Sequence, residues 1–425
     1  MSEGAVPGYL LPRTASLDAR GVLSIGGVSV SRLAERFQTP LFIYDETQIR
    51  QLMREIRSVF PGNVVYASKA FGAVAMARIV SEEGLWWDAA SEGELAAALR
   101  GKIPAKKVVL HGNNKSPREL ATALEVGVGR IVVDSFDEID RLLALCDRER
   151  VPKVWVRVTP GIEAHTHEYI RTGQQDSKFG FNLANGDASR AIRILKRAGK
   201  VELAGVHCHI GSQIFETGFF KEAIEVMADL LHGEELGDLC MGGGLGVAYI
   251  NGESAPSVGE WGTFIAEQAA GRGIDAANLY VEPGRSLVAA AAVTLYTVGA
   301  VKAIPGIRTY VAVDGGMSDN PRPVLYGSGY EAFLPERAFD PHDTAMTVVG
   351  KHCESGDILV RDALLPANLR SGELLVTPVT GAYGYSMGSN YNRLPRPAVV
   401  FVKDGSAREV IRRESVADLF RLEMG

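Results

Sequence analysis

The sequence predicts an α/β fold joined to an all-β part, namely a (β/α)8 barrel with a C-terminal β-barrel or β-sandwich domain. Two observations predict it. Eight short apolar runs alternate with helical segments between residues 64 and 282, and strand-like runs divided by Gly- and Pro-rich turns follow after about residue 290. The same alternation also permits an open doubly wound sheet, which stays an alternative.

The eight apolar runs are short and rich in β-branched residues, which is typical of parallel strands that are buried on both faces. Eight such strand–helix units over about 250 residues favour a closed barrel. The predicted strands are residues 64–67, 85–89, 108–111, 131–133, 154–158, 203–207, 239–241 and 279–282.

Helical spacing of apolar residues is clearest in two segments, Glu92–Arg100 and Pro117–Val126. Ser91 and Ser116 precede them, and each serine has an acidic residue three positions further on. This spacing predicts an N-cap at both positions.

In the C-terminal third, the alternation of strands and helices gives way to a series of strands. Strands are predicted at 294–303, 309–313, 344–349, 373–378 and 398–402, with a helix at 415–422. Residues 21–31 also alternate like strands and are expected to join this part. The predicted organisation is an N-terminal segment of the β domain at 1–38, a barrel at 39–290 and a C-terminal β domain at 291–425.

Net charge, apolar runs and cysteine content limit the classes of protein to which the chain could belong. A net charge of −6 and a pI near 5.9 give no electrostatic reason to expect nucleic-acid binding. No apolar run approaches the ~20 residues that a membrane helix needs, and the N-terminus lacks the pattern of a signal peptide. The four cysteines form no disulfide framework, so we expect a cytoplasmic protein.

Polar side chains gather where the predicted strands end, which is where (β/α)8 barrels carry their active sites. Lys69 directly follows the first strand, VVYAS. A surface lysine is the simpler interpretation, and a buried amine with a lowered pKa that forms an imine is the functional one. The other candidates at strand ends are Asp88, His111, Arg157, His209, Gly242 to Gly244 and Glu282.

The segment AGVHCHIGSQ places His207 and His209 on one face of a strand. A structural histidine pair, a zinc site and an imidazole stacked on a flat cofactor are the three interpretations, and no CxxC or HExxH spacing supports zinc. The run MGGGLGVAY follows the seventh strand, where (β/α)8 barrels commonly bind phosphate, although many glycine runs are only tight turns.

The segment VEPGRS ends the eighth strand. Glu282 could form an ion pair with Arg285. Alternatively, a carboxylate beside a pyridine nitrogen keeps that nitrogen protonated, so that the ring can accept the electrons left by a decarboxylation.

Taken together, eight motifs in this order resemble the alanine-racemase-like (fold type III) pyridoxal-phosphate enzymes, and within them the diaminopimelate decarboxylases. The resemblance covers roughly residues 40–397. Thr159 and Phe71 depart from residues common in relatives, and neither belongs to the expected catalytic set. The motifs are YASKAF, RVTPGIEAHTHEYIRTGQQDSKFGF, GVHCHIGSQ, GGGLG, EPGRS, DNPRPVLYG, CESGD and GAYGYSMGSNYN.

The resemblance implies pyridoxal 5'-phosphate as the cofactor and assigns roles by position. Lys69 resembles the Schiff-base lysine, and Cys353, in CESGD, resembles the proton donor. This loop reaches into the neighbouring subunit's site in the family, which implies a homodimer with shared active sites. Further cofactor contacts are implied for His209, Ser212, Gly243, Gly244, Glu282, Gly284, Arg285 and Tyr383, and substrate contacts for Arg285, Arg322, Tyr326, Glu354 and Tyr383.

The expected substrate is the small amino acid meso-diaminopimelate, which has a second carboxylate. Arg285, Arg322 and Tyr326 together can bind that group, because guanidinium forks suit carboxylates. This pair of arginines and the motif THEYIRTG argue against a sister decarboxylase for ornithine, arginine or carboxynorspermidine. A non-catalytic pyridoxal-phosphate-binding barrel is the other alternative, but such proteins lack a β domain and a CESGD motif. No metal is expected.

Overall fold

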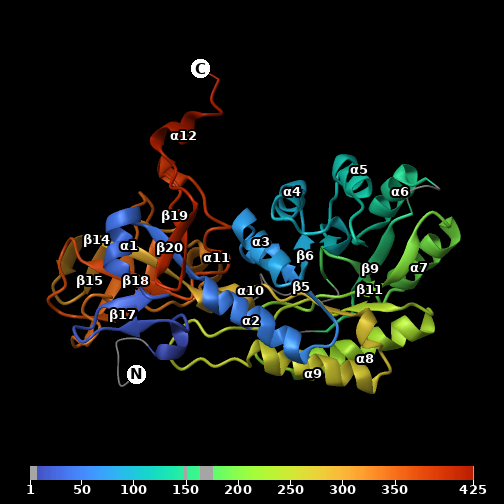
Figure 1. Cartoon of the computed structure of the whole chain (residues 1–425), viewed down its shortest axis with the longest axis horizontal. Coiled ribbons are helices and arrows are strands. Elements are labelled where there is room, and N and C mark those ends of the chain that lie inside the picture. Colours follow the sequence, from blue (N-terminus) through green and yellow to red (C-terminus); the bar gives the residue numbers. More distant parts are fainter. Residues whose placement is uncertain (1–6, 148–150, 163–175, 425) are drawn as a thin grey trace. The chain divides into compact units, whose positions relative to one another are not determined.

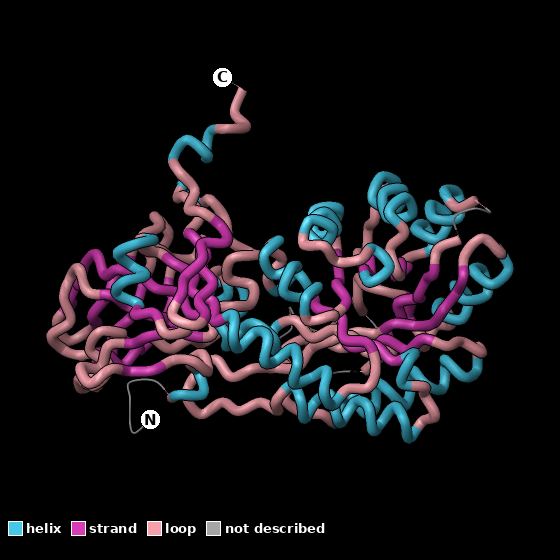
Figure 2. The backbone as a smooth tube through the Cα atoms, in the orientation of Figure 1, coloured by secondary structure: helices cyan, strands magenta, loops and turns pink. Residues whose placement is uncertain are grey.

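The computed structural model describes residues 7–147, 151–162 and 176–424. The chain forms two compact units. The barrel unit comprises residues 52–246 and 255–286, and the β unit comprises residues 1–51, 247–254 and 287–425. Figure 2 shows helices alternating with strands in the first and mainly strands in the second.

Eight parallel strands of the barrel unit close on themselves, because β13 pairs with β5 and β8 pairs with β9. The predicted (β/α)8 barrel is therefore confirmed, and the open sheet is excluded. A short strand, β10 (Phe181–Asn182), adds to β9. The barrel strands are β5 (Asn63–Ala67), β6 (Trp86–Ala89), β7 (Val108–Leu110), β8 (Arg130–Val133), β9 (Lys153–Thr159), β11 (Glu202–His207), β12 (Asp238–Cys240) and β13 (Leu279–Val281).

Helices surround these strands on the outside (Figure 1). Both predicted N-caps are confirmed, since the hydroxyls of Ser91 and Ser116 accept hydrogen bonds from the backbone N–H of Glu94 and Glu119. The helices are α2 (Glu46–Val59), α3 (Val74–Glu82), α4 (Glu92–Arg100), α5 (Pro117–Val126), α6 (Phe136–Leu145), α7 (Asp187–Ala198), α8 (Gly218–Gly233) and α9 (Val258–Gly271).

The lower end of the barrel, where the strands begin, is filled by large side chains around one ion pair. Arg130 Nη2 lies 2.7 Å from Asp238 Oδ2, which also accepts a hydrogen bond of 2.9 Å from Trp155 Nε1. Tyr280 packs edge-on against Trp155, with ring centroids 4.7 Å apart. This layer plugs the barrel, so chemistry is confined to the opposite, carboxyl end of the strands.

The β unit is built on an eight-stranded mixed sheet in the order β17-β16-β15-β14-β4-β19-β20, with β18 also paired to β14. The predicted strands 294–303, 309–313, 344–349, 373–378 and 398–402 are confirmed within one or two residues, and three further strands of this sheet, β4, β17 and β20, were missed. The strands are β4 (Leu41–Asp45), β14 (Ala292–Ile304), β15 (Arg308–Val313), β16 (Thr344–Val349), β17 (Ile358–Leu365), β18 (Leu374–Pro378), β19 (Ala398–Lys403) and β20 (Ser406–Ile411).

Residues 21–31 belong to the β unit and contribute to a small separate sheet of β1 (Ser16–Leu17), β2 (Leu23–Ile25) and β3 (Val28–Ser29). Strand β4 also lies in the β unit, although its residues fall in the range predicted for the barrel, 39–290. The remaining helices are α1 (Val30–Phe37), α10 (Arg285–Val288), α11 (Arg322–Tyr326) and α12 (Val416–Phe420). Within the described residues, no helix combines the length and the apolar character needed to cross a membrane.

Candidate active site

Lys69 lies just past the end of β5, on a single 3-10 turn (Ser68–Ala70) that connects β5 to α3. Its neighbours Ser68 and Ala70 are buried, whereas Lys69 itself is exposed. The positive charge of Lys69 acts on two groups at the end of the barrel, because it lowers the pKa of His209 and opposes the rise in the pKa of Asp88.

Glu282 lies directly after β13, the strand that pairs with β5, and is 6% exposed. Both of its carboxylate oxygens are engaged by imidazoles. His111 Nε2 lies 2.9 Å from Oε1, and His207 Nε2 lies 3.0 Å from Oε2. Three strands, β7, β11 and β13, thus meet in one buried acid–imidazole cluster.

Burial and neighbouring charges shift the pKa values of the groups in this cluster. Burial acts to raise the pKa of Glu282, but His111 and His207 outweigh it and hold the pKa well below its ordinary value. Burial lowers the pKa of His207 to about 4. The pKa of His111 is raised, because Asp88 and Glu282 together overcome its burial. Burial also raises the pKa of Asp88 to about 6. At neutral pH, Glu282 is consequently an ionised carboxylate inside the barrel.

His209 follows β11 and is half-buried. Its Nδ1 accepts a hydrogen bond of 3.2 Å from the backbone N–H of Gly243. Burial, together with the charge of Lys69, lowers the pKa of His209 well below its ordinary value. The imidazole is therefore neutral and fixed in orientation by the glycine run after β12.

Three consecutive glycines in that run have no room for a side chain. A Cβ atom on Gly242 would lie 2.5 Å from the carbonyl oxygen of Cys208, and one on Gly243 would lie 2.2 Å from that of Glu282. Gly244, with φ of +113°, would bring a Cβ within 2.4 Å of the Gly211 oxygen. Glycine is therefore required for the backbone to pack this closely at the mouth of the barrel.

Ser212 and Arg285 lie together at the same end of the barrel. Arg285 Nη2 donates a hydrogen bond of 2.7 Å to Ser212 Oγ, and Arg285 is buried, with 6% of its surface exposed. Gly284 packs against β5, where a Cβ would meet that of Ala67 at 2.9 Å. A buried guanidinium beside a hydroxyl and a glycine loop is chemistry suited to a phosphate.

The chemistry of these donors fits pyridoxal phosphate. An exposed amine suits the aldehyde, a buried ionised carboxylate suits the protonated ring nitrogen, and the Ser212–Arg285 pair suits the phosphate. The residues that the sequence placed in the cofactor site therefore converge at one end of the barrel, except Tyr383, which lies in the β unit.

Among the residues that the structure describes, one cluster has side chains that could hold a metal ion. Ligand atoms of His111, His207 and Glu282 lie within 4.8 Å of one another. However, each imidazole Nε2 stands at hydrogen-bond distance from a separate oxygen of Glu282, as a proton shared between the two groups requires. The arrangement is thus accounted for without a metal.

The substrate candidates Arg322 and Tyr326 lie on α11 in the β unit. Arg322 is 5% exposed, and its guanidinium donates hydrogen bonds of 3.0 Å to both Tyr330 Oη and Ser328 Oγ. Rings of Tyr249, Tyr326 and Tyr383 surround it, with centroids 4.9, 5.6 and 5.8 Å from Arg322 Cζ. Aromatic faces stabilise this buried cation without neutralising it.

Tyr383 has φ of +64°, a left-handed backbone conformation that costs free energy for a non-glycine residue. Such backbone strain persists only where the surrounding structure imposes it, and strained residues are often found at functional sites. Tyr383 is thus brought together with Arg322 and Tyr326, while Arg285, the other arginine assigned to the substrate, lies in the barrel unit.

Cys353 and Glu354 are exposed on the loop between β16 and β17. Asp357 anchors the loop, because its carboxylate accepts hydrogen bonds from the backbone N–H groups of Met317 (2.7 Å) and His352 (2.9 Å). His352 Nδ1 lies 2.9 Å from the same carboxylate. The exposed side chains of Cys353 and Glu354 are therefore carried by an anchored loop.

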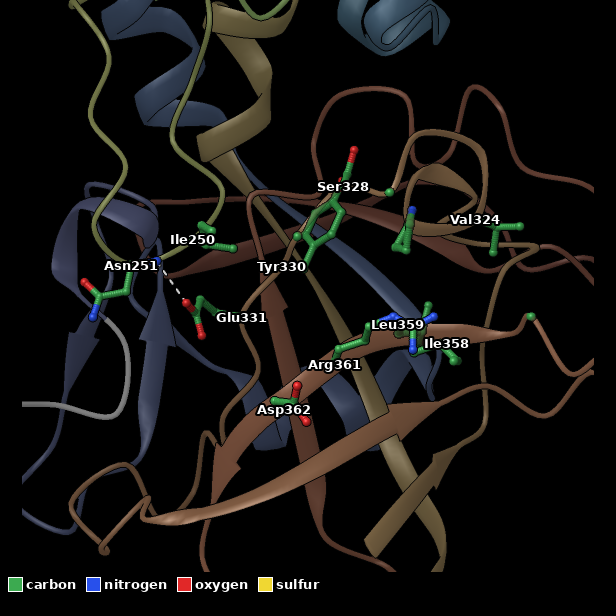
Figure 3. A pocket seen from close by; sticks show the side chains of 14 residues that line it. Ile250, Asn251, Val324, Ser328, Tyr330, Glu331, Ile358, Leu359, Arg361 and Asp362 are labelled. Atoms are coloured by element: carbon green, nitrogen blue, oxygen red, sulfur yellow. Dashed lines mark hydrogen bonds between the residues drawn. The ribbon is translucent and has the colours of Figure 1, made fainter. Parts of the chain in front are cut away.

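A cavity of about 500 Å³ lies in the β unit beside α11 (Figure 3). Arg361 and Asp362 of β17 line it, as do Tyr330 and Glu331, and the Glu331 carboxylate accepts a hydrogen bond from the backbone N–H of Asn251. Gly356 of the CESGD loop also lines it. The sequence predicted neither the cavity nor the connection through Tyr330 to Arg322.

Sequence reasoning also missed that His111 and His207 both bind Glu282. The signal was weak, because the three residues are separated by up to 171 positions and meet only when the barrel closes. The motif THEYIRTG, used to argue substrate choice, lies outside the described residues.

Known proteins match this chain over most of its length. Residues 46–289 match the family model described as "Pyridoxal-dependent decarboxylase, pyridoxal binding domain". The chain is 46% identical to the diaminopimelate decarboxylase of Bacillus subtilis and 44% identical to that of Mycobacterium tuberculosis, with 97% of each chain covered in both cases.

Solved structures give the same result. Diaminopimelate decarboxylase from M. jannaschii, in a co-complex with L-lysine, has a TM-score of 0.91 at 30% identity, covering 97% of this chain and 98% of that one. A lysine/ornithine decarboxylase from Vibrio vulnificus has a TM-score of 0.76 at 22% identity, covering 88% and 97%, which is a likeness of fold. The chain therefore belongs to the pyridoxal-dependent decarboxylases, in the diaminopimelate decarboxylase family.

Proposed function

We propose that this protein decarboxylates meso-2,6-diaminopimelate to L-lysine and carbon dioxide, the last step of lysine biosynthesis, with pyridoxal 5'-phosphate as its cofactor. One observation carries the proposal. An amine at the end of β5 and a buried ionised carboxylate at the end of the adjacent β13 occur in a chain that is 46% identical, over 97% of its length, to a diaminopimelate decarboxylase.

The barrel unit would hold the cofactor. Lys69 would bind its aldehyde, His209 would lie on the ring face, and Glu282 would face the ring nitrogen. Tyr383 of the β unit is proposed as a further cofactor contact. Bound pyridoxal phosphate supplies an electron-accepting ring for the pair left when the bond between Cα and the carboxylate breaks. The phosphate would be held by Ser212, Gly243, Gly244, Gly284 and Arg285.

The remaining residues select the substrate and complete the reaction. Arg322, Tyr326 and Arg285 would bind the distal carboxylate of diaminopimelate, and Glu354 its distal ammonium. Cys353 would deliver the proton that replaces carbon dioxide at Cα. An ornithine or arginine decarboxylase is the second candidate. Among the described residues no carboxylate pairs with the buried Arg322, which argues against that candidate because its substrates lack the second carboxylate.

We further propose a cytoplasmic homodimer in which Cys353 and Glu354 serve the partner's site. Their exposure on an anchored loop of the β unit supports this assignment, because exposed side chains on a rigid base are available to a second copy.

The first test measures the cofactor and the reaction together. Purified protein should show an absorption band near ~420 nm, as expected of pyridoxal phosphate held by a lysine. It should release carbon dioxide from meso-diaminopimelate but not from ornithine or arginine. Lys69→Ala should abolish both signals, whereas Lys106→Ala, at an exposed lysine, should preserve them. Full turnover by Lys69→Ala would end the proposal.

The second test addresses the shared site. Lys69→Ala and Cys353→Ala are each expected to have little activity. If one subunit provides Lys69 and its partner Cys353, random mixing of the two variants restores about a quarter of the wild-type sites, because half of the dimers are mixed and one of their two sites is intact. No recovery after verified subunit exchange would show that both residues come from one chain.

A further inference from the structure

We propose that His111 and His207 are positioning residues that hold Glu282 in one orientation as a carboxylate for the ring nitrogen of the cofactor, and that Asp88 is the acid supporting His111. This inference rests on the proposed function, which places the cofactor ring at Glu282. It assigns roles to three buried residues outside the direct contacts proposed above.

The geometry supplies the first argument. Each imidazole binds a different oxygen of Glu282, at 2.9 and 3.0 Å, and the two imidazole rings meet edge to face with centroids 4.9 Å apart. A carboxylate that is bound at both oxygens cannot rotate about its terminal bond without breaking a buried hydrogen bond, which costs free energy. The pair therefore fixes the plane in which Glu282 presents its remaining lone pairs.

The protonation of the two histidines supplies the second argument. His207 Nδ1 has no hydrogen-bond partner in the described part of the chain, while its Nε2 lies at Glu282. That arrangement is the one a neutral imidazole takes when Nε2–H donates. His111 has Asp88 Oδ1 at 3.9 Å and Glu282 Oε1 at 2.9 Å, so two acids favour its protonated form.

The two histidines thus act differently on the same carboxylate. His207 contributes a neutral donor, and His111 contributes a donor that carries positive charge. Both oppose protonation of Glu282, and a proton shared between Glu282 and a pyridine nitrogen then resides on the nitrogen. In the described part of the chain, further charged or titratable groups act on this cluster, namely Lys69, Glu94, Arg157, Cys208, His209 and Cys240.

The test compares leucine and glutamine at both positions. Leucine removes the donor, whereas glutamine keeps a neutral N–H near the site of Nε2. For His111→Leu and His207→Leu we expect the dissociation constant for pyridoxal phosphate to rise about ten-fold or more, because one bond to a charged acceptor is lost. Glutamine at 207 should restore most of the affinity, and glutamine at 111 only part of it, because the charge is also lost.

A second readout needs no cofactor. Selective 15N labelling of the imidazoles in cofactor-free protein should show His207 as the neutral Nε2–H tautomer at pH 7. In Asp88→Asn, His111 should titrate at lower pH than in the wild type, because one of its two acids is gone. This measurement remains available if a leucine variant does not fold.

The control is His232→Leu, at an exposed histidine on α8, which should leave cofactor affinity unchanged. Folded His111→Leu and His207→Leu proteins with wild-type affinity and an unaltered absorption band would overturn the proposal. So would stoichiometric metal in wild-type protein that is lost in both variants. If wild-type protein binds no pyridoxal phosphate, the proposed function fails instead, and the two failures are distinguished.

Discussion

At the scale of single residues, the described part of the β unit surrounds the buried Arg322 with aromatic rings rather than with acids. Arg322 is bonded to Tyr330 and Ser328 and lies over three tyrosine rings, so the positive charge remains available to an anion. A lysine at this position would keep the charge but lose the planar fork that binds a carboxylate at two points.

We therefore expect Arg322→Lys to raise KM for meso-diaminopimelate by about 30-fold or more, as a loss of roughly 2 kcal/mol or more implies. Affinity for pyridoxal phosphate should change little. Steady-state kinetics and cofactor titration of the same preparation check this. Equal loss of both would indicate that Arg322 only supports the local structure.

Asp319 is a buried acid whose titration gives a stability prediction. Burial raises its pKa from 3.8 to about 7. Between these values the folded protein keeps a proton that the unfolded chain releases, so stability falls as pH rises from about 4 to about 7. Asp319→Asn does not titrate. As pH rises from about 4 to about 7, the free energy of unfolding of the variant should therefore increase relative to that of the wild type by up to about 4 kcal/mol.

Denaturant unfolding of both proteins at pH 4, 6 and 8 measures this difference. The hydrogen bond from the backbone N–H of Gly316 to the Asp319 side chain can persist in the variant, because an amide oxygen also accepts. Parallel stability curves for the two proteins would contradict the prediction.

The predicted site residues that the structure brings to one end of the barrel share one property, which is that strand order alone brings them together. Lys69, His209, Gly243 and Glu282 follow separate strands of one barrel, so their common end follows from the fold. The exposure of Lys69 and the partners of Glu282 depend on side-chain directions, which strand order does not set. The sites of Arg322 and Cys353 rest on the family resemblance, because no periodic pattern surrounds them.

At the scale of elements, the loop between β16 and β17 depends on one carboxylate. Asp357 is 3% exposed and binds two backbone N–H groups and His352, whose ring stacks on that of Tyr391. Neighbouring glycines leave no space for adjustment, since a Cβ on Gly350 would lie 2.1 Å from Asp357 Oδ2.

Asp357→Asn should loosen this loop, because an amide group cannot accept at both of its ends. Deuterium exchange of the amides in 350–358 should accelerate about ten-fold or more, as the loss of a bond to a charged acceptor implies. kcat should fall more than KM changes, because Cys353 lies on the loop. Asp362→Asn, at an exposed position of β17, is the control. Unchanged exchange would exclude this role for Asp357.

Elements with apolar periodicity were the easiest to predict. Helices α4 and α5 begin and end where the sequence placed them, since capping serines mark their starts. Two of the missed strands, β17 and β20, lack such signals. Residues of β20, SAREVI, are exposed or half-buried, and β17 contains Arg361 and Asp362 at consecutive positions together with shifts in register. Only pairing with neighbours makes these segments strands.

At the scale of the whole molecule, the barrel separates stability from chemistry. Asp238 at the lower end of the strands binds Arg130 and Trp155, while the candidate catalytic groups lie at the other end. Removing one member of a buried ion pair leaves the other charge uncompensated.

Asp238→Ala should therefore lower the free energy of unfolding by about 3–5 kcal/mol, while the folded protein keeps its affinity for pyridoxal phosphate. Glu202→Ala provides a matched control. Glu202 begins the neighbouring strand and pairs with Lys153 on the surface, where such pairs contribute about 0–1 kcal/mol. Urea unfolding and cofactor titration distinguish the outcomes, and similar losses in both variants would contradict the prediction.

Strand β4 has a consequence for biosynthesis. Its five residues are all buried between β14 and β19, yet those partners begin only at residues 292 and 398. While the ribosome is still making the barrel, the segment LFIYD has emerged without either neighbour. Such an unpaired apolar strand is prone to aggregate, so a nascent chain stalled before residue 292 should be retained by a chaperone that binds extended apolar segments, and release should follow synthesis of the last strands.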